Sequence, residues 1–110
     1  MFKHFIRLLI GSVRDSAEPA VGRVVEQSLA EVCNLVEGRL QGMTLAEARG
    51  FVRARATQVV MREARLAIAN SADRDFTSLA DVARRATERL IPQVIRKMYV
   101  GAQRTHRVAA

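Results

Sequence analysis

The sequence predicts an all-α protein, a small bundle of three long helices plus a short amphipathic helix at the N-terminal end. Apolar residues recur every three, four or seven positions along most of the chain, which is the period of helices and not of strands. Two of the predicted long helices open with residues typical of a helix N-cap, at Thr44 and at Ser78. Because 49% of the 110 residues are hydrophobic, we expect a folded globular chain.

A chain of 110 residues has room for one core and not for two. We therefore expect a single helical domain over residues 1–101. Residues 102–110 follow Gly101, carry Arg104 and Arg107, and are expected to form a basic, flexible tail.

The first predicted element runs from Phe2 to Val13 and is amphipathic. Arg7 and other basic residues lie opposite its apolar face, which is formed by Phe2, Phe5, Ile6 and Leu9. We expect this helix to dock on the core. Two alternatives remain at this stage: a basic helix of this kind also binds anionic membrane surfaces, and it also suits a mitochondrial-type presequence.

The second helix is predicted from about Ala17 to Gly38 or Leu40. It carries one broad apolar arc, and Pro19 falls in its first turn, where proline is tolerated. Gly38 and Gly42 are expected to end it, with Gly42 as the glycine that follows the C-cap.

The third helix is predicted to start at Leu45 and to end near Asn70. Thr44 and Glu47 have the spacing of a capping box, in which each side chain bonds to the other residue's backbone N–H. Gly50 lies inside this helix, where it costs about 1 kcal/mol relative to alanine. That cost is easier to explain if another backbone approaches closely there.

The third helix has two apolar stripes on opposite sides, which is the most informative feature of the chain. One stripe is Leu45, Val52, Val59 and Leu66, and we expect it to face the second and fourth helices. The other stripe is Phe51, Ala54, Met61 and Ile68, and we predict that it contacts a second copy or another protein. The alternative is that the short first helix covers this second stripe within one chain.

The fourth helix is predicted to begin after Ser78 and to end at Gly101. Its apolar stripe runs from Leu79 to Met98, and Pro92 on the polar side should kink it. Residues 78–86 resemble the opening helix of a helix-turn-helix repressor. The stripe continues through residues 87–91 without a turn signal, so the second helix of that motif is not predicted.

The sequence gives little support for an enzyme. No triad, carboxylate pair, metal-ligand spacing or glycine-rich phosphate loop stands out, and Cys33 is the only cysteine. We predict no catalytic residue, metal, cofactor or small-molecule substrate.

The formal net charge of +7 indicates an anionic partner or surface. Most of the positive charge is arginine, which makes bidentate contacts with phosphate. The candidate contacts for an anion or a nucleic acid are Arg49, Arg53, Arg85, Arg89, Arg96, Arg104 and Arg107.

These observations favour a non-enzymatic interaction or assembly module, homo-oligomeric and with a basic surface for an anionic partner. The alternative is a small nucleic-acid-binding protein that uses an arginine-lined helix face. The third reading is a peripheral membrane protein attached through residues 2–13. No apolar run approaches the ~18 residues of a membrane-spanning helix, so a cytoplasmic location is expected.

Overall fold

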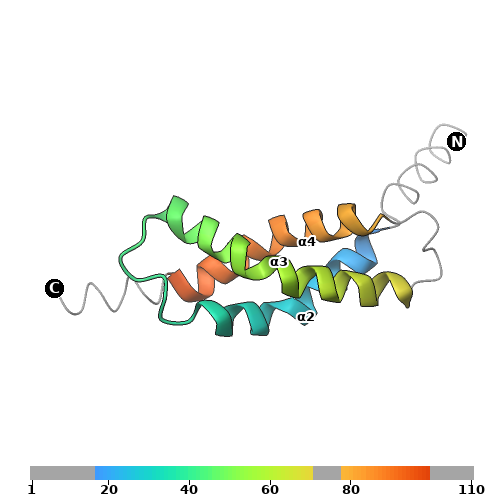
Figure 1. Cartoon of the computed structure of the whole chain (residues 1–110), viewed down its shortest axis with the longest axis horizontal. Coiled ribbons are helices and arrows are strands. Elements are labelled where there is room, and N and C mark those ends of the chain that lie inside the picture. Colours follow the sequence, from blue (N-terminus) through green and yellow to red (C-terminus); the bar gives the residue numbers. More distant parts are fainter. Residues whose placement is uncertain (1–16, 71–77, 100–110) are drawn as a thin grey trace, which may run out of the picture.

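The computed structural model describes residues 17–70 and 78–99. These residues form three long α-helices and a terminal π-helical turn, in the order α2 (Glu18–Val36), α3 (Leu45–Ala69), α4 (Leu79–Val94) and η2 (Ile95–Tyr99). The chain runs along α2, returns along α3 and turns back along α4, and each long helix contacts the other two (Figure 1). The predicted all-α bundle is confirmed for this part of the chain. The predicted helix at residues 2–13 and the tail at 102–110 lie outside the described residues.

Helix α2 begins at Glu18, with Pro19 in its first turn as expected. Its N-cap residue, Ala17, has no side chain that can cap the helix. The helix ends at Val36, two residues before Gly38, which has a φ of +74°. Gly38, and not Gly42, is therefore the glycine after the C-cap. Gly42 has a φ of +81° and serves the loop that leads into α3.

Helix α3 has the N-terminus that its sequence predicts. The Thr44 hydroxyl accepts a hydrogen bond from the Glu47 amide at 3.1 Å, and the Glu47 carboxylate accepts one from the Thr44 amide at 2.8 Å. The helix ends at Ala69, and the Asn70 amide donates to the Leu66 carbonyl at 3.1 Å. The capping box and both predicted ends are confirmed.

Helix α4 begins after Ser78, whose hydroxyl accepts a hydrogen bond from the Asp81 amide at 3.2 Å. Pro92 lies on the exposed side of the helix, where it removes a backbone donor. The α-helical pattern ends two residues later and continues as η2, a π-helical turn. The Tyr99 hydroxyl donates to the Met43 carbonyl at 2.7 Å, which ties this turn to the loop between α2 and α3.

Small residues fill the core. Among the described residues, eight alanines and ten valines account for most of the 21 buried apolar residues, and only Leu40, Leu90 and Ile91 are larger. In α3 the buried positions Ala48, Val52, Ala56, Val60 and Ala64 follow one another at four-residue intervals. Rows of this spacing form the ridges by which helices pack closely.

The expected inner stripe of α3 is only half right. Val52 and Val59 are buried, but Leu45 is 45% exposed and Leu66 is 53% exposed. Leu45 lies in the first turn of the helix. Residues spaced seven apart drift gradually around an α-helix, so this series moves away from the buried row, whose members are four residues apart. Alanines take the positions in contact with α2 and α4 because they let the helices approach.

Candidate interaction site

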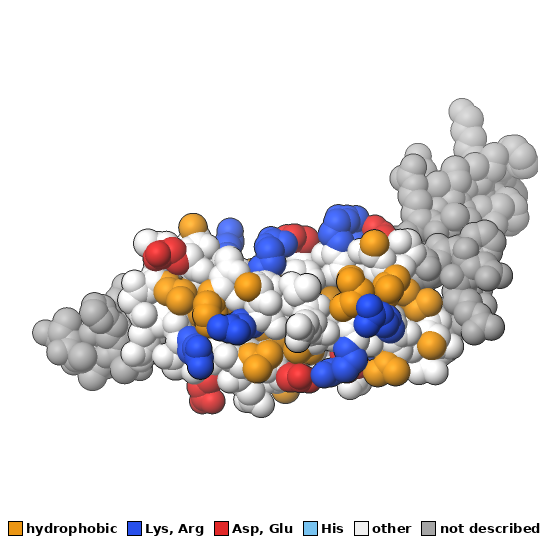
Figure 2. All heavy atoms as spheres, in the orientation of Figure 1, with side chains coloured by type: hydrophobic (Ala, Val, Ile, Leu, Met, Phe, Trp, Pro, Cys, Tyr) orange, Lys and Arg blue, Asp and Glu red, His pale blue; other side chains and the backbone are white. Residues whose placement is uncertain are grey.

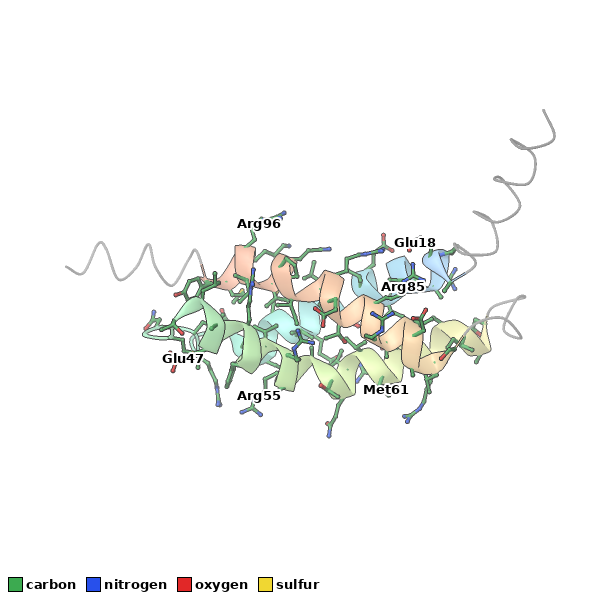
Figure 3. All side chains as sticks on the ribbon, turned by 90° about the horizontal axis from the view of Figure 1, so that it is seen from above. Glu18, Glu47, Arg55, Met61, Arg85 and Arg96 are labelled. Carbon is green, nitrogen blue, oxygen red and sulfur yellow. The ribbon has the colours of Figure 1, made fainter. Side chains whose placement is uncertain are left out.

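The predicted interface residues lie along the side of α3 that does not carry the alanine and valine row. We call Phe51, Ala54, Met61 and Ile68 the outer strip. Ala54 is exposed, and the other three are half-buried and pack against the edge of the core. Arg55 and Met61 lie along the outer edge of α3 when the bundle is viewed from above (Figure 3). The described helices thus leave this strip partly open.

Two ion pairs mark the borders of the outer strip. Arg62 of α3 pairs with Glu31 of α2 at 2.5 Å, which places α2 along one border. Arg53 of α3 pairs with Glu88 of α4 at 2.5 Å, which places α4 along the other. The four side chains are about half exposed, so water screens their charges and the two ion pairs add little stability. The pairs serve here to show where the strip ends on each side.

The strip has an aromatic end and a sulfur-containing middle. The Arg55 guanidinium stands 4.9 Å from the centre of the Phe51 ring, a cation–π contact within one turn of α3. Met61 adds a flexible side chain that adapts to the shape of a partner. Figure 2 shows apolar side chains reaching the surface along the bundle, with arginine and lysine side chains between them.

Two leucines outside the predicted interface are also exposed. Leu66 in α3 and Leu35 in α2 are 53% and 44% exposed. Leu35 stands one turn beyond Glu31, the residue that pairs with Arg62, so helical spacing puts it on the α3 side of α2. Leu66 belongs to the stripe that is predicted to face the second and fourth helices, and no local signal in the sequence marks either leucine as a surface residue.

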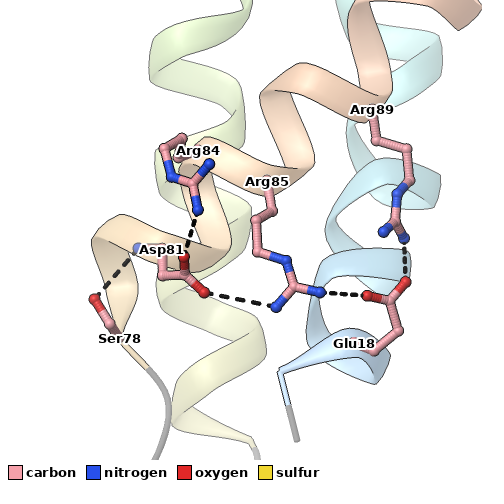
Figure 4. Close-up of polar contacts among 6 residues, drawn as sticks. All are labelled: Glu18, Ser78, Asp81, Arg84, Arg85 and Arg89. Atoms are coloured by element: carbon pink, nitrogen blue, oxygen red, sulfur yellow. Dashed lines mark hydrogen bonds and ion pairs between the residues drawn. The ribbon is translucent and has the colours of Figure 1, made fainter. Parts of the chain in front are cut away.

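The arginine-lined face of α4 is engaged with the protein's own carboxylates. Arg85 donates to one Glu18 oxygen at 2.6 Å, and Arg89 donates to the other (Figure 4). Arg85 also pairs with Asp81 at 3.6 Å, and Arg84 pairs with the same carboxylate at 2.7 Å. A phosphate at this face would have to displace Glu18.

These contacts shift the carboxyl groups toward the charged form. The hydrogen bond from Arg89, supported by the charge of Arg85, holds the pKa of Glu18 below its usual value. The hydrogen bond from Arg84 lowers the pKa of Asp81 in the same way. Glu18 also stands at the N-terminus of α2, where the helix dipole favours a negative charge.

The other candidate anion contacts do not join Arg85 and Arg89 in one cluster. Arg53 is committed to Glu88. Arg49 and Arg96 are exposed and form no ion pair with the described residues. Arg104 and Arg107 lie outside the described residues, as does the candidate membrane face of Phe2, Phe5, Ile6 and Leu9.

Two side chains in α2, Cys33 and Ser28, carry a thiol and a hydroxyl that lie in or beside the apolar core. Burial raises the pKa of the Cys33 thiol, which favours its protonated form. The Ser28 hydroxyl is fully buried and has no hydrogen-bond partner among the described residues. Within residues 17–70 and 78–99, no three His, Cys, Asp or Glu side chains are grouped to hold a metal ion.

No helix in the described part of the chain is both long and apolar enough to cross a membrane. Comparison with protein-family models, with curated proteins and with solved structures found no match.

Proposed function

We propose that this chain is a non-enzymatic helical assembly module that self-associates through the outer strip of α3. One observation carries the proposal: the core is closed with alanine and valine, while larger apolar side chains remain at its edge and surface. Burying such side chains contributes about 1.5–3 kcal/mol each, so leaving several at the surface forgoes a large stabilisation.

The composition of the strip supports a protein partner. Aromatic residues and methionine are enriched in the centres of protein interfaces, and arginine is enriched as well. Phe51 and Met61 supply the first two types, and Arg55 and Arg62 border them. An amphipathic helix from a second chain fits such a strip by knobs-into-holes packing.

The test compares two charge insertions into α3. Ala54 is exposed, so Ala54→Glu leaves the bundle folded but places a carboxylate in the middle of the strip. Leu45→Glu is the matched control, because Leu45 is 45% exposed at the end of the same helix and lies outside the strip. Met61→Glu is a second disruptive variant at a half-buried position.

Light scattering coupled to size exclusion gives the readout at micromolar concentration. We expect an oligomer for the unmodified chain and for Leu45→Glu, and a monomer for Ala54→Glu and Met61→Glu with helical circular dichroism retained. A monomeric unmodified chain would overturn the proposal. So would an oligomer that both strip variants leave intact.

The basic surface is proposed to attract an anionic partner, with Arg49 and Arg96 as its described contacts outside the internal ion pairs. Nucleic acid is the alternative partner, and its binding should weaken steeply with salt. The engagement of Arg85 and Arg89 by Glu18 does not favour it over self-association.

A further inference from the structure

The outward-facing residues of α3 form a self-complementary set. At 3.6 residues per turn, six residues fall within an arc of about 60° on the side of α3 away from its buried row. They are Glu47, Gly50, Ala54, Met61, Arg65 and Ile68, and all are exposed except the half-buried Met61 and Ile68.

We propose that two copies of the chain pack their α3 helices antiparallel about a two-fold axis that passes between Thr57 and Gln58. This inference rests on the proposed function and names the partner, its direction and its register. About that axis the six residues form three reciprocal pairs, as a two-fold interface requires. The pairs are Ala54 with Met61, Gly50 with Arg65, and Glu47 with Ile68.

Residue size supports the antiparallel direction. The N-terminal half of the arc holds the small residues Gly50 and Ala54, and the C-terminal half holds Met61 and Ile68. Antiparallel pairing sets the Met61 side chain of each copy over the Ala54 of the other. Parallel pairing would set Met61 against Met61 and leave a gap between the two glycines, so it packs less well.

Gly50 provides an independent reason for a second chain. A Cβ atom built at Gly50 would meet no atom of the described residues within 4 Å, so nothing in residues 17–70 and 78–99 requires glycine there. Glycine inside a helix is unfavourable and needs a compensating reason. In the antiparallel pair, Gly50 leaves room for the Arg65 side chain of the other copy to lie across the helix.

Charge supports the same direction. Glu47 and Arg65 are the charged residues of the arc, and they stand at its opposite ends. In the antiparallel pair, the Arg65 side chain of each copy crosses Gly50 of the other copy. It then points toward that other copy's Glu47, which lies about one turn from Gly50. Parallel packing would bring like charges together at both ends, which is unfavourable.

Spin labels at two exposed positions of α3 test this register. Cys33→Ala removes the only cysteine, and Gln58→Cys or Ala69→Cys then supplies a single attachment site in the full-length chain. The proposed axis passes beside residue 58, so its two labels should lie in close dipolar contact. At 1.5 Å per residue, the two copies of residue 69 should lie about 35 Å apart along the helices.

Each outcome is decisive. Close contact at residue 58 with a separation of about 35 Å at residue 69 supports the antiparallel register. Close contact at both positions means parallel packing, and wide separation at both means a different interface. Either result overturns the register while self-association stands. A monomer by light scattering overturns the proposed function together with the register.

Discussion

The two sides of α3 are built from different residues, although both are apolar. The inner side is a row of alanine and valine at four-residue intervals, and it is buried against α2 and α4. The outer side carries the small residues Gly50 and Ala54 in its N-terminal half and Met61 and Ile68 in its C-terminal half, and it stays partly open. Apolar patterning alone does not distinguish these two sides. The size of the side chain decides which one can be packed closely within the monomer.

The same added side chain should have very different effects on the two sides of α3. Ala56 is fully buried and Ala54, two residues earlier, is exposed. Ala56→Leu should lower the free energy of unfolding by about 3 kcal/mol, because overpacking a tight core strains it. Ala54→Leu should change it by less than about 0.5 kcal/mol. Urea denaturation at a protein concentration low enough to keep every variant monomeric measures both, so that self-association does not contribute.

Similar losses at the two positions would contradict the comparison. They would mean that another segment of the same chain covers the outer strip, as the intramolecular alternative requires. In that case the strip would be part of the core and could not serve as an interface.

The two glycines in the described helices should also differ in their effect on self-association. Gly50 in α3 and Gly22 in α2 both have open space around a Cβ atom. Replacing either with alanine should raise the free energy of unfolding by up to about 1 kcal/mol through helix propensity. Only the Gly50 variants should weaken self-association, and Gly50→Leu more than Gly50→Ala.

Thermal unfolding and concentration-dependent light scattering separate the two effects of the glycine variants. The expected signature for Gly50 is a more stable monomer that associates at least tenfold less tightly. Unchanged association in Gly50→Leu would contradict a close approach of a second α3 at this position.

Local signals in the sequence correctly predicted where α3 and α4 begin and where α3 ends. The capping box at the start of α3 joins Thr44 and Glu47, which lie within one turn of each other. Their spacing in the sequence is therefore enough to predict the box. Gly38 and Gly42 were both recognised as turn residues. Gly38 takes the position after the C-cap that is predicted for Gly42, because α2 ends at Val36, before residue 38.

Contacts between distant segments could not be predicted in this way. The pairing of Glu18 with Arg89 joins residues 71 positions apart, so the arginine face of α4 looked free in the sequence. The buried row of α3 was missed in part for another reason. A search for apolar residues gives leucines more weight than alanines such as Ala56 and Ala64. Only small residues fit where the helices meet, so these alanines are buried.

The smallest expected effect concerns the contacts of Glu18, which join α2 to α4 on the polar side of the bundle. Glu18→Gln should lower the free energy of unfolding by at most about 1 kcal/mol, because Glu18 and Arg89 are each about 40% exposed and screened by water. Glu26→Gln is the matched control, since Glu26 is exposed on the same helix and forms no ion pair with the described residues.

The pH dependence identifies the source of the Glu18 effect. Because the folded protein lowers the pKa of Glu18, its stabilisation is present above the pKa of the unfolded chain, about 4.3, and disappears as the pH falls through the lower folded value. The stability difference between the unmodified chain and Glu18→Gln should therefore be present at neutral pH and vanish in acid. A difference that persists in acid would mean that the side chain acts by packing and not by charge.

The same variant tests whether the arginine face binds nucleic acid. Glu18→Gln releases Arg85 and Arg89 from a negative partner, so phosphate binding at this face should become tighter and more salt-dependent. Gel-shift titrations at two salt concentrations compare it with Glu26→Gln, which changes the net charge equally. Equal affinity in the two variants would show that Arg85 and Arg89 serve only to join α4 to α2, and the outer strip of α3 would remain the surface to which function is assigned.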